Sequence, residues 1–244
     1  MLSSKFIINF IKKNNPIFNN KLSNFYNYPR VVSLAHFSYL IDKYKIKNQR
    51  NICVINSNNN EPELKFINEK FIEFLNFEDN KKYDLDKEWK HKKRQYSFII
   101  CNQVLEHLFN PIMGFKNILY HAIKGTYIWI TIPTINCIHG ELHFYSSGFH
   151  PRFLERLAKL NNCTVLHLGY WGSRKYLINA VLGHWLNAEE LSGKIKNLKS
   201  LRQLLHPMYF FIDGTKDESK NKKNNFVFNK NQVITDTWVL LKKN

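Results

Sequence analysis

Short apolar runs alternate with helical patterns along most of the chain. The runs are rich in β-branched and aromatic side chains and are bounded by Asn, Pro or charged residues, which is typical of buried β-strands. Between several of them, apolar residues recur at intervals of three and four, as on one face of an α-helix. Because strands and helices alternate, the predicted fold class is α/β, with a mostly parallel sheet and helices on both faces. We predict strands at residues 51–55, 71–75, 83–85, 96–101, 126–132, 164–168 and 237–241, and helices at residues 31–44, 63–71, 111–123 and 151–160.

The predicted helix 111–123 has the clearest boundaries. Asn110 is a good N-cap, Pro111 suits the first helical turn, and Gly125 suits the end of the helix. Apolar residues within it recur at helical spacing and are expected to face the core. These residues are Ile112, Phe115, Leu119 and Ile123.

The chain divides into a short leader and one domain. Residues 1–30 are basic, and the first acidic residue of the chain is Asp42, so we treat this leader as an extension of a domain at residues 31–244. A leader helix, a membrane-surface segment and an organelle presequence all fit its composition. Residues 174–232 form a long insertion before the last strand, and the nearly all-polar stretch 213–225 predicts a mobile loop.

Cysteine usage and hydropathy indicate a reducing compartment without a membrane span. The longest apolar run, at residues 126–132, falls well short of the ~20 residues that a membrane-spanning helix needs. None of the four cysteines forms a CxxC pair, which argues against a zinc cluster. Cys53 and Cys101 lie in predicted strands and are expected to be buried. We therefore expect a cytoplasmic protein, with organelle targeting by the basic N-terminus as the alternative.

The chain is strongly basic, with 36 Lys and Arg against 19 Asp and Glu and a formal net charge of +17. A net charge of that sign favours polyanionic partners such as nucleic acid. However, the chain is very rich in Asn and Lys, which AT-rich codons encode, and its lysines are scattered. Genome composition is therefore the explanation that we favour over a nucleic acid partner. Similarly, the basic run at residues 91–94 is either a solvated loop, which we favour, or a phosphate grip.

In open α/β sheets, ligands bind outside the carboxyl ends of the strands, where the strand order reverses. The residues that follow each predicted strand are therefore the first candidates for a site. They include residues 56–61, 102–107 and 133–145. The second of these groups belongs to a strongly patterned segment, SFIICNQVLEHLFNP, at residues 97–111.

SFIICNQVLEHLFNP resembles the post-motif segment of class I S-adenosylmethionine-dependent methyltransferases, and in particular of the methyltransferase type 11 group. Downstream, a strand ending in Ile-Pro, a His-containing loop, the stretch HFYSSGFHPRFLERLAKL and a strand leading to GYWGS resemble the second half of that family. The resemblance covers residues 31–176 and the final strand. It implies a Rossmann-like, seven-stranded sheet with an antiparallel final strand. It also implies S-adenosylmethionine as methyl donor and transfer to a nucleophilic O, N, C or S atom.

The loop after the first strand departs from the family pattern. The family has a GxGxG-type loop there, whose glycines adopt positive φ and let the backbone approach the cofactor. Here residues 55–61 read INSNNNE and contain no glycine, although Asn tolerates the left-handed region better than other residues do. Two interpretations follow. Either a variant pocket still binds S-adenosylmethionine, or the chain is a non-catalytic, methyltransferase-like fold that has lost cofactor binding and acts as a binding or assembly protein.

The resemblance implies a cofactor site built from the strand ends. The acid that usually ends the second strand and binds the ribose hydroxyls is not obvious, and Glu73 or Asn76 can stand in for it. We expect the acceptor to be a small molecule or a glycan. A nucleotide-binding oxidoreductase fits less well, because GxGxxG is absent. The predicted cofactor-binding residues are Asn56, Asn58, Asn60, Glu73, Asp84, Leu85, Asn102 and Gln103.

Glu106, His107 and His143 are the candidate catalytic residues. In ubiquinone-biosynthesis O-methyltransferases and small-RNA 3′-end methyltransferases, an ExxEH phrase supplies metal ligands. Here Gln103 replaces the first carboxylate, so no metal site is predicted. His107 or His143 can instead act as a general base. The plainer interpretation, which we favour, is that Glu106 and His107 satisfy backbone groups near a helix start. Catalysis in this class depends mainly on positioning, so an enzyme does not require an obvious base.

Overall fold

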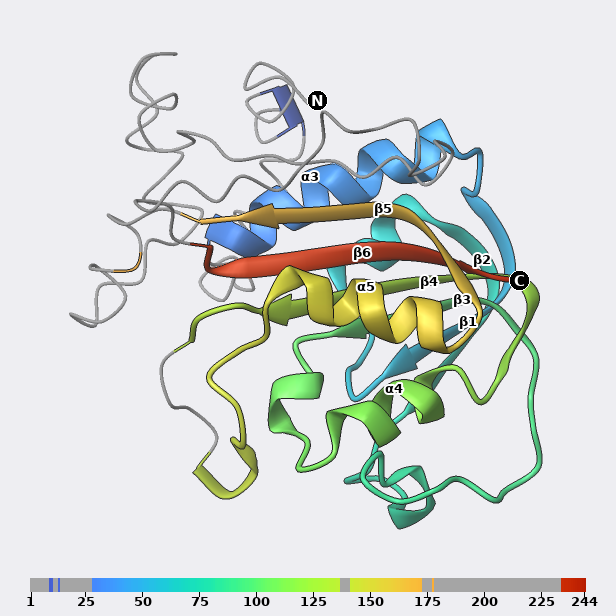
Figure 1. The fold of residues 1–244 in the computed structure, drawn as a ribbon. Coiled ribbons are helices and arrows are strands. Elements are labelled where there is room, and N and C mark those ends of the chain that lie inside the picture. The colour runs from blue at the N-terminus through green and yellow to red at the C-terminus, as the bar shows by residue number, and fades with distance from the viewer. Residues whose placement is uncertain (1–8, 11–12, 14–27, 137–140, 173–176, 178–233) are drawn as a thin grey trace.

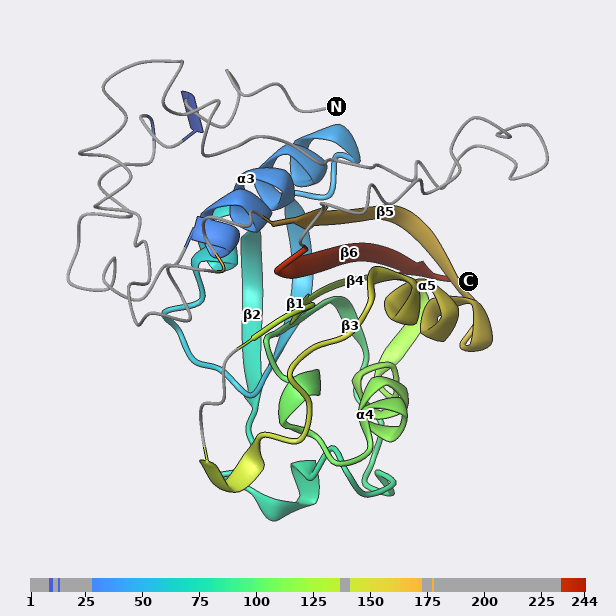
Figure 2. The same ribbon diagram turned by 60° about the vertical axis from the view of Figure 1, so that its left-hand side comes forward.

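The computed structural model describes residues 9–10, 13, 28–136, 141–172, 177 and 234–244. This part of the chain has three layers, with a six-stranded sheet in the middle. Helix α3 (Tyr28–Lys43) covers one face, and helices α4 (Pro111–Ile118) and α5 (Pro151–Leu160) cover the other (Figures 1 and 2). The predicted α/β, Rossmann-like class is confirmed.

The order of the strands reverses beside the first strand. The sheet has the order β2-β1-β3-β4-β6-β5. Strands β1 to β4 pair in parallel, whereas β6 runs antiparallel to both β4 and β5, which confirms the predicted antiparallel final strand. The chain steps outward from β1 to β2 and then crosses to β3 on the other side of β1, so the switch point lies between the carboxyl ends of β1 and β3. The strands are β1 (Asn48–Ile55), β2 (Asn68–Leu75), β3 (Tyr96–Asn102), β4 (Ala122–Pro133), β5 (Cys163–Trp171) and β6 (Asp236–Lys243).

The central strands bury side chains on both faces of the sheet. In β3, Phe98 and Ile100 pack in the core under α3, whereas Ile99 and Cys101 pack in the core under α4 and α5. Successive side chains of a strand point to opposite faces, so one apolar run supplies both cores. Cys53 and Cys101 are buried, as predicted.

Helix α4 begins as predicted but ends earlier. The side chain of Asn110 accepts a backbone N–H of the first turn at 3.0 Å, and Pro111 occupies that turn. The helix ends at Ile118 because the chain already enters β4 at Ala122. The predicted core face is therefore half right, since Phe115 and Leu119 are buried and Ile112 and Ile123 are exposed.

The predicted helix at residues 63–71 is reduced to the 3₁₀ helix η2 (Pro62–Phe66). Strand β2 starts at Asn68, which pairs with Asn48 at the beginning of β1. Pairing along the whole of β1 therefore overrides the local helical pattern.

The predicted strand at residues 83–85 is not formed. The 3₁₀ helix η3 (Lys81–Tyr83) and a turn take its place, because the side chains of Asn80 and Asp84 accept backbone N–H groups two residues ahead, at 3.1 and 3.0 Å. Such local hydrogen bonds compete with strand pairing. The described part of the sheet has six strands as a result, one fewer than the resemblance implies.

Some predictions fall outside the described residues. They concern most of the extension at 1–30, the insertion at 174–232 apart from Leu177, and Cys137. Helix α3 begins at Tyr28, inside the last part of the predicted extension. None of the helices that the structure describes is long and apolar enough to cross a membrane.

A buried ion-pair network joins the start of α3 to the connection between β1 and β2. Nη1 and Nη2 of Arg30 each donate to one carboxylate oxygen of Glu63 at 2.7 Å, and Nη2 also lies 2.7 Å from Oε2 of Glu61. The fully buried Glu63 also accepts a hydrogen bond from Nε1 of Trp129 in β4, at 3.3 Å. Burial raises the pKa of Glu63 to about 8, and the neighbouring Glu61 acts in the same direction, although Arg30 opposes both. One guanidinium thus supplies the positive charge and the hydrogen-bond donors for two carboxyl groups.

Glu61 extends this network to the strand ends. Its carboxylate accepts hydrogen bonds from Oγ of Ser57 at 2.6 Å and from Nδ2 of Asn102 at 2.9 Å. Burial by itself raises the pKa of Glu61, but Arg30 and these hydrogen bonds outweigh it, so the net direction is downward. The charged form of Glu61 therefore holds the loop after β1 against the end of β3.

Substitution of Arg30 by Met keeps the apolar stem of the side chain and removes its charge. We expect the free energy of unfolding to fall by about 3–5 kcal/mol, because the buried charge of Glu61 loses its counter-ion and Glu63 loses two hydrogen-bond donors. Urea denaturation followed by circular dichroism measures this loss. The matched control is Arg152→Met, which removes an exposed guanidinium 3.7 Å from Glu155 and should cost less than about 1 kcal/mol. Equal losses in the two variants would contradict a structural role for the network.

Candidate functional site

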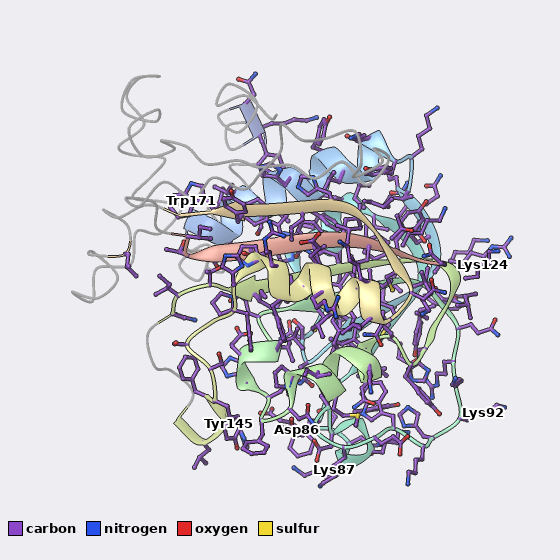
Figure 3. All side chains as sticks on the ribbon, in the orientation of Figure 1. Asp86, Lys87, Lys92, Lys124, Tyr145 and Trp171 are labelled. Atoms are coloured by element: carbon purple, nitrogen blue, oxygen red, sulfur yellow. The ribbon has the colours of Figure 1, made fainter. Side chains whose placement is uncertain are left out.

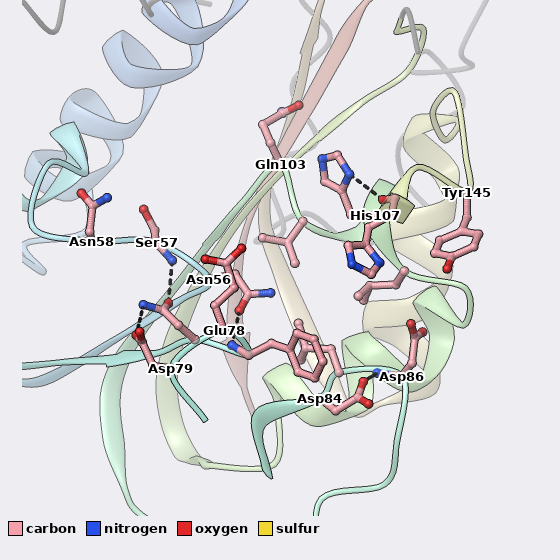
Figure 4. A pocket seen from close by; sticks show the side chains of 16 residues that line it. Asn56, Ser57, Asn58, Glu78, Asp79, Asp84, Asp86, Gln103, His107 and Tyr145 are labelled. Carbon is pink, nitrogen blue, oxygen red and sulfur yellow. Dashed lines mark hydrogen bonds between the residues drawn. The ribbon is translucent and has the colours of Figure 1, made fainter. Parts of the chain in front are cut away.

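A cavity of about 610 Å³ opens at the carboxyl ends of β1, β2 and β3, next to the switch point (Figure 4). Its walls come from the loops after these three strands, from residues 84–86 and from the loop after β4. The volume lies within the ~300–1,000 Å³ range of small-molecule sites. The lining residues are Asn56, Ser57, Asn58, Asn76, Phe77, Glu78, Asp79, Asp84, Leu85, Asp86, Gln103, Val104, His107, Leu108, His143 and Tyr145.

Asparagine side chains hold together the loops after β1 and β2. Asn56 has a positive φ of 48°, which is the left-handed conformation that glycine usually supplies at such a turn. Its Oδ1 accepts the backbone N–H of Phe77 at 3.1 Å. In return, Oδ1 of Asn76 accepts the backbone N–H of Ser57 at 2.9 Å, and Nδ2 of Asn76 donates to Asp79 at 2.8 Å. The turn therefore forms without glycine, with its side chains used as cross-links between loops.

The wall opposite these loops is fixed by Asp86. Its carboxylate accepts the backbone N–H groups of Phe109 and Asn110, at 3.2 and 2.7 Å, just before α4 begins. Asp84 accepts the N–H of Asp86 and pairs with the exposed Lys87 at 2.9 Å. These bonds dock residues 84–86 against the start of α4 and keep both carboxylates at the cavity.

The 3₁₀ helix η4 (Leu105–His107) forms the wall after β3. Gln103 turns the chain out of β3 with a φ of 52°. His107 lies at the cavity, and its Nδ1 donates to the backbone carbonyl of His143 at 2.8 Å, which leaves Nε2 as the acceptor nitrogen of the neutral ring. The side chain of His107 thus satisfies a backbone group, which lies in the loop after β4 rather than near a helix start.

Glu106 is buried behind His107. Its carboxyl group is fully buried, neither oxygen has a hydrogen-bond partner in the described part of the chain, and Oε1 lies 3.9 Å from Nε2 of His107. Burial raises the pKa of Glu106 to about 8, and the charge of Asp236 acts in the same direction. The backbone carbonyl of Glu106, not its side chain, accepts the N–H groups of Tyr145 and Ser146, at 3.2 and 3.1 Å.

The cavity lining is acidic although the chain is basic. Four carboxylates line it, and no Lys or Arg is found among the described residues that do so. The formal net charge of the chain is +17. A lining with several carboxylates and no cation of its own attracts a cation and repels phosphates. The acidic residues are Glu78, Asp79, Asp84 and Asp86.

The structure brings seven of the predicted site residues to this cavity and leaves four outside its lining. Asn60 and Glu106 are not lining residues, and Asn102 turns its amide to Glu61. Glu73 lies within β2, where it accepts a hydrogen bond from Tyr96 at 2.6 Å and forms an ion pair with Arg94. The residues that do line the cavity are Asn56, Asn58, Asp84, Leu85, Gln103, His107 and His143.

The acidic turn after β2 also lines the cavity. Asn76 was considered as a stand-in for the ribose acid, but Glu78 and Asp79, which follow it, were not predicted. The predicted strand already ended at Leu75, so the rule that ligands bind beyond strand ends was enough to find them. In the described part of the chain, no three His, Cys, Asp or Glu side chains are grouped to hold a metal ion. Phe77, Asp86 and Leu108 also line the cavity and were not predicted, whereas Ser57, Val104 and Tyr145 lie within the candidate groups 56–61, 102–107 and 133–145.

Several solved structures have similar folds at low sequence identity. The N-methyltransferase NodS from Bradyrhizobium japonicum, in complex with S-adenosyl-L-homocysteine, is 10% identical, with a TM-score of 0.44 over 68% of this chain and 92% of NodS. The cyclase SpnF is 7% identical, with a TM-score of 0.49 over 99% and 97% of the two chains. A phosphoethanolamine N-methyltransferase from Haemonchus contortus is 10% identical, with a TM-score of 0.49 over 100% of this chain and 60% of the other.

The family assignment does not depend on these structures, whose TM-scores are all below 0.5. The comparison with curated proteins gave no match. A family model described as a methyltransferase domain matches residues 36–207, which is more than half of the sequence. The chain therefore belongs to the methyltransferase domain family and is a class I S-adenosylmethionine-dependent methyltransferase.

Proposed function

We propose that the acidic cavity binds S-adenosylmethionine and that the chain transfers its methyl group to a small molecule or a glycan. The observation that carries this proposal is the set of four carboxylates at the switch point, without a Lys or Arg among the described lining residues. S-adenosylmethionine carries a sulfonium cation and a ribose diol, and both suit carboxylates. The volume of about 610 Å³ favours an acceptor of modest size.

Asn76 and Asp79 are the groups that we assign to the ribose. Asn76 directly follows β2, where the resemblance implies a carboxylate, and its amide is hydrogen-bonded to Asp79 at 2.8 Å. Asn76 thereby holds the carboxylate of Asp79 next to the position where the family usually has its own carboxylate. Asp84 and Leu85 form the wall that we assign to the adenine, and Ser57 and Asn58 border the methionine end.

The loop without glycine is compatible with binding. A degenerate pocket is expected if asparagine side chains fill the cofactor volume. Asn60 is not among the lining residues, and Asn56 directs its Oδ1 to the backbone of Phe77. Asn58 does line the cavity, and its Oδ1 accepts the backbone N–H of Asn60 at 2.9 Å. These contacts favour the enzyme over a binding protein that has lost its cofactor.

His107 is the general base that we propose. S-adenosylmethionine supplies an electrophilic methyl group, whose bond to sulfur breaks as the acceptor atom bonds to carbon. An acceptor hydroxyl or ammonium group must also lose a proton. Nε2 of His107 can take it, because Nδ1 is committed to the carbonyl of His143. His143 and Tyr145 then border the acceptor, and the backbone carbonyl of Glu106 holds their loop in place.

Calorimetric titration tests the cofactor site directly. We expect S-adenosylmethionine and S-adenosylhomocysteine to bind to the 244-residue chain. Asp79→Asn should weaken the affinity about tenfold or more, since a hydrogen bond to a charged group contributes ~1.5–3 kcal/mol. Asp42→Asn, which removes an exposed carboxylate from α3, is the matched control and should bind like the wild type. A folded protein that binds neither ligand at millimolar concentration would sink the proposal.

The buried carboxyl of Glu106 gives a prediction for stability against pH. Its pKa is raised to about 8 in the folded state, so the folded chain keeps a proton that the unfolded chain releases above its ordinary pKa of 4.5. This contribution to stability is present at low pH and is lost as the pH rises towards 8. Glu106→Gln cannot release that proton. We expect its stability relative to the wild type to rise between pH 5 and 8, by up to about 1.4 kcal/mol per pH unit.

Denaturation at a series of pH values measures this slope. The matched control is Glu88→Gln, which changes a carboxyl with 70% of its side chain exposed. A stability difference that stays flat from pH 5 to 8 for Glu106→Gln would show that the carboxyl is charged when folded.

A further inference from the structure

Residues 81–94 line two cavities, with acidic side chains at one and basic side chains at the other. Asp84 and Asp86 line the acidic cavity. On the other side of the same segment, a second cavity of about 370 Å³ is lined by Lys82, Tyr83, His91, Lys92, Lys93 and Arg94. Figure 3 shows Lys92 on the outer part of this segment, away from Asp86 and from Tyr145. One stretch of chain thus forms an acidic wall and a basic wall.

The lysines of the second cavity have no counter-charge. Lys87 pairs with Asp84 at 2.9 Å and Lys90 lies 3.8 Å from Glu88, but both are outside the basic lining. Within the described part of the chain, Lys82, Lys92 and Lys93 form no ion pair. Arg94 is the exception, because it pairs with Glu73. Several like charges around one hollow repel each other unless an anion joins them.

Aromatic rings hold two of these lysines at the hollow. Nζ of Lys82 lies 4.8 Å from the ring centre of Tyr83, and Nζ of Lys93 lies 4.9 Å from that of Tyr120. Cation–π contacts of this kind favour one placement of an otherwise flexible side chain. The ammonium groups are therefore positioned near the cavity rather than spread through solvent.

A pair of hydrogen-bonded histidines, His91 and His121, lies beside these lysines. Nδ1 of the buried His121 accepts the backbone N–H of Arg94 at 2.8 Å, so its proton is on Nε2. That proton is donated to Nε2 of His91 at 3.0 Å, which puts the proton of His91 on Nδ1. His91 lines the cavity, and the described residues provide no acceptor for its Nδ1. An anion in the cavity can accept this N–H.

We propose that this cavity binds a phosphate group, between the ammonium groups of Lys82, Lys92 and Lys93 and the imidazole of His91. A phosphate offers several strong acceptor oxygens and up to two negative charges, which matches three unpaired cations and one N–H donor. The group comes either from a small phosphorylated molecule or from a nucleic acid backbone. The site is separate from the acidic cavity and does not rest on methyl transfer.

The histidine pair reports on the occupancy of the site. Burial and then the charge of Lys82 lower the pKa of His91, and burial, His91, Arg94 and Lys93 lower the pKa of His121 to about 4. A bound phosphate offsets the cationic charges, so the pKa of the pair should rise on binding. The charge of Arg94 is itself paired with Glu73. The rings packed around the pair are Tyr83, Trp89, Tyr96 and Tyr120.

Titration of inorganic phosphate into the 244-residue chain, followed by NMR of the histidine rings, tests the proposal. We expect saturable shifts of the His91 and His121 signals, which His91→Gln and His121→Gln assign by the loss of one signal set each. The double variant K92A/K93A should bind phosphate at least tenfold more weakly. The double variant K65A/K70A removes the same charge from exposed positions in η2 and in β2, and it should change binding less than twofold.

A single-stranded uridine dodecamer, followed by fluorescence anisotropy, separates the two sources of phosphate. A nucleic acid ligand predicts tighter binding than inorganic phosphate, with a salt slope that K92A/K93A reduces by about 1.4, because each lost contact removes about 0.7. A small phosphorylated ligand predicts saturable phosphate binding and no gain with the oligonucleotide. Binding of neither probe overturns the proposal, and so do equal losses in the two double variants, which would reflect net charge alone.

Discussion

The guanidinium of Arg30, held between Glu61 and Glu63, is the constraint on which the site depends. A charged group buried away from water is tolerated only when it is paired and hydrogen-bonded, so Arg30 and the two carboxyl groups fix each other's positions. The network links the start of α3 with the residues between β1 and β2, which otherwise contain only the short helix η2. Because Glu61 also binds Ser57 and Asn102, the same charges set the distance between the ends of β1 and β3.

This network explains how the loop after β1 keeps its form without glycine. A glycine-rich loop adopts its turn because no side chain opposes positive φ. Here Asn56 accepts the strained φ, and its side chain gains a hydrogen bond to the loop after β2. The far end of the loop is anchored by the charge of Glu61. Side-chain hydrogen bonds thus hold the turn that glycine permits in a glycine-rich loop.

The sequence predicted the elements whose signals are local. The apolar run of β3, the Asn-Pro start of α4 and the helix α5 lie where the pattern placed them. It failed where pairing or turn chemistry competes with that pattern. Residues 68–71 pair with β1 in the sheet, and the side chains of Asn80 and Asp84 fold residues 81–86 into turns. Glu73 is a different case, because β2 ends at Leu75 as predicted and Glu73 therefore lies within the strand rather than beyond its end.

In the segment Gln103–His107, the 3₁₀ helix η4 directs some side chains to the cavity and others into the core. With three residues per turn, Val104 and His107 fall on one side and line the cavity, whereas Glu106 is turned into the protein. In the ExxEH families that the phrase resembles, its carboxylates serve a metal ion. Here the first position is a neutral Gln103, and the Glu106 carboxyl is buried behind the cavity wall with a raised pKa. A hard cation prefers charged oxygen ligands, so the donor set at η4 does not fit one. What remains at the cavity is His107, an imidazole whose Nδ1 is fixed by the backbone and whose Nε2 can accept a proton.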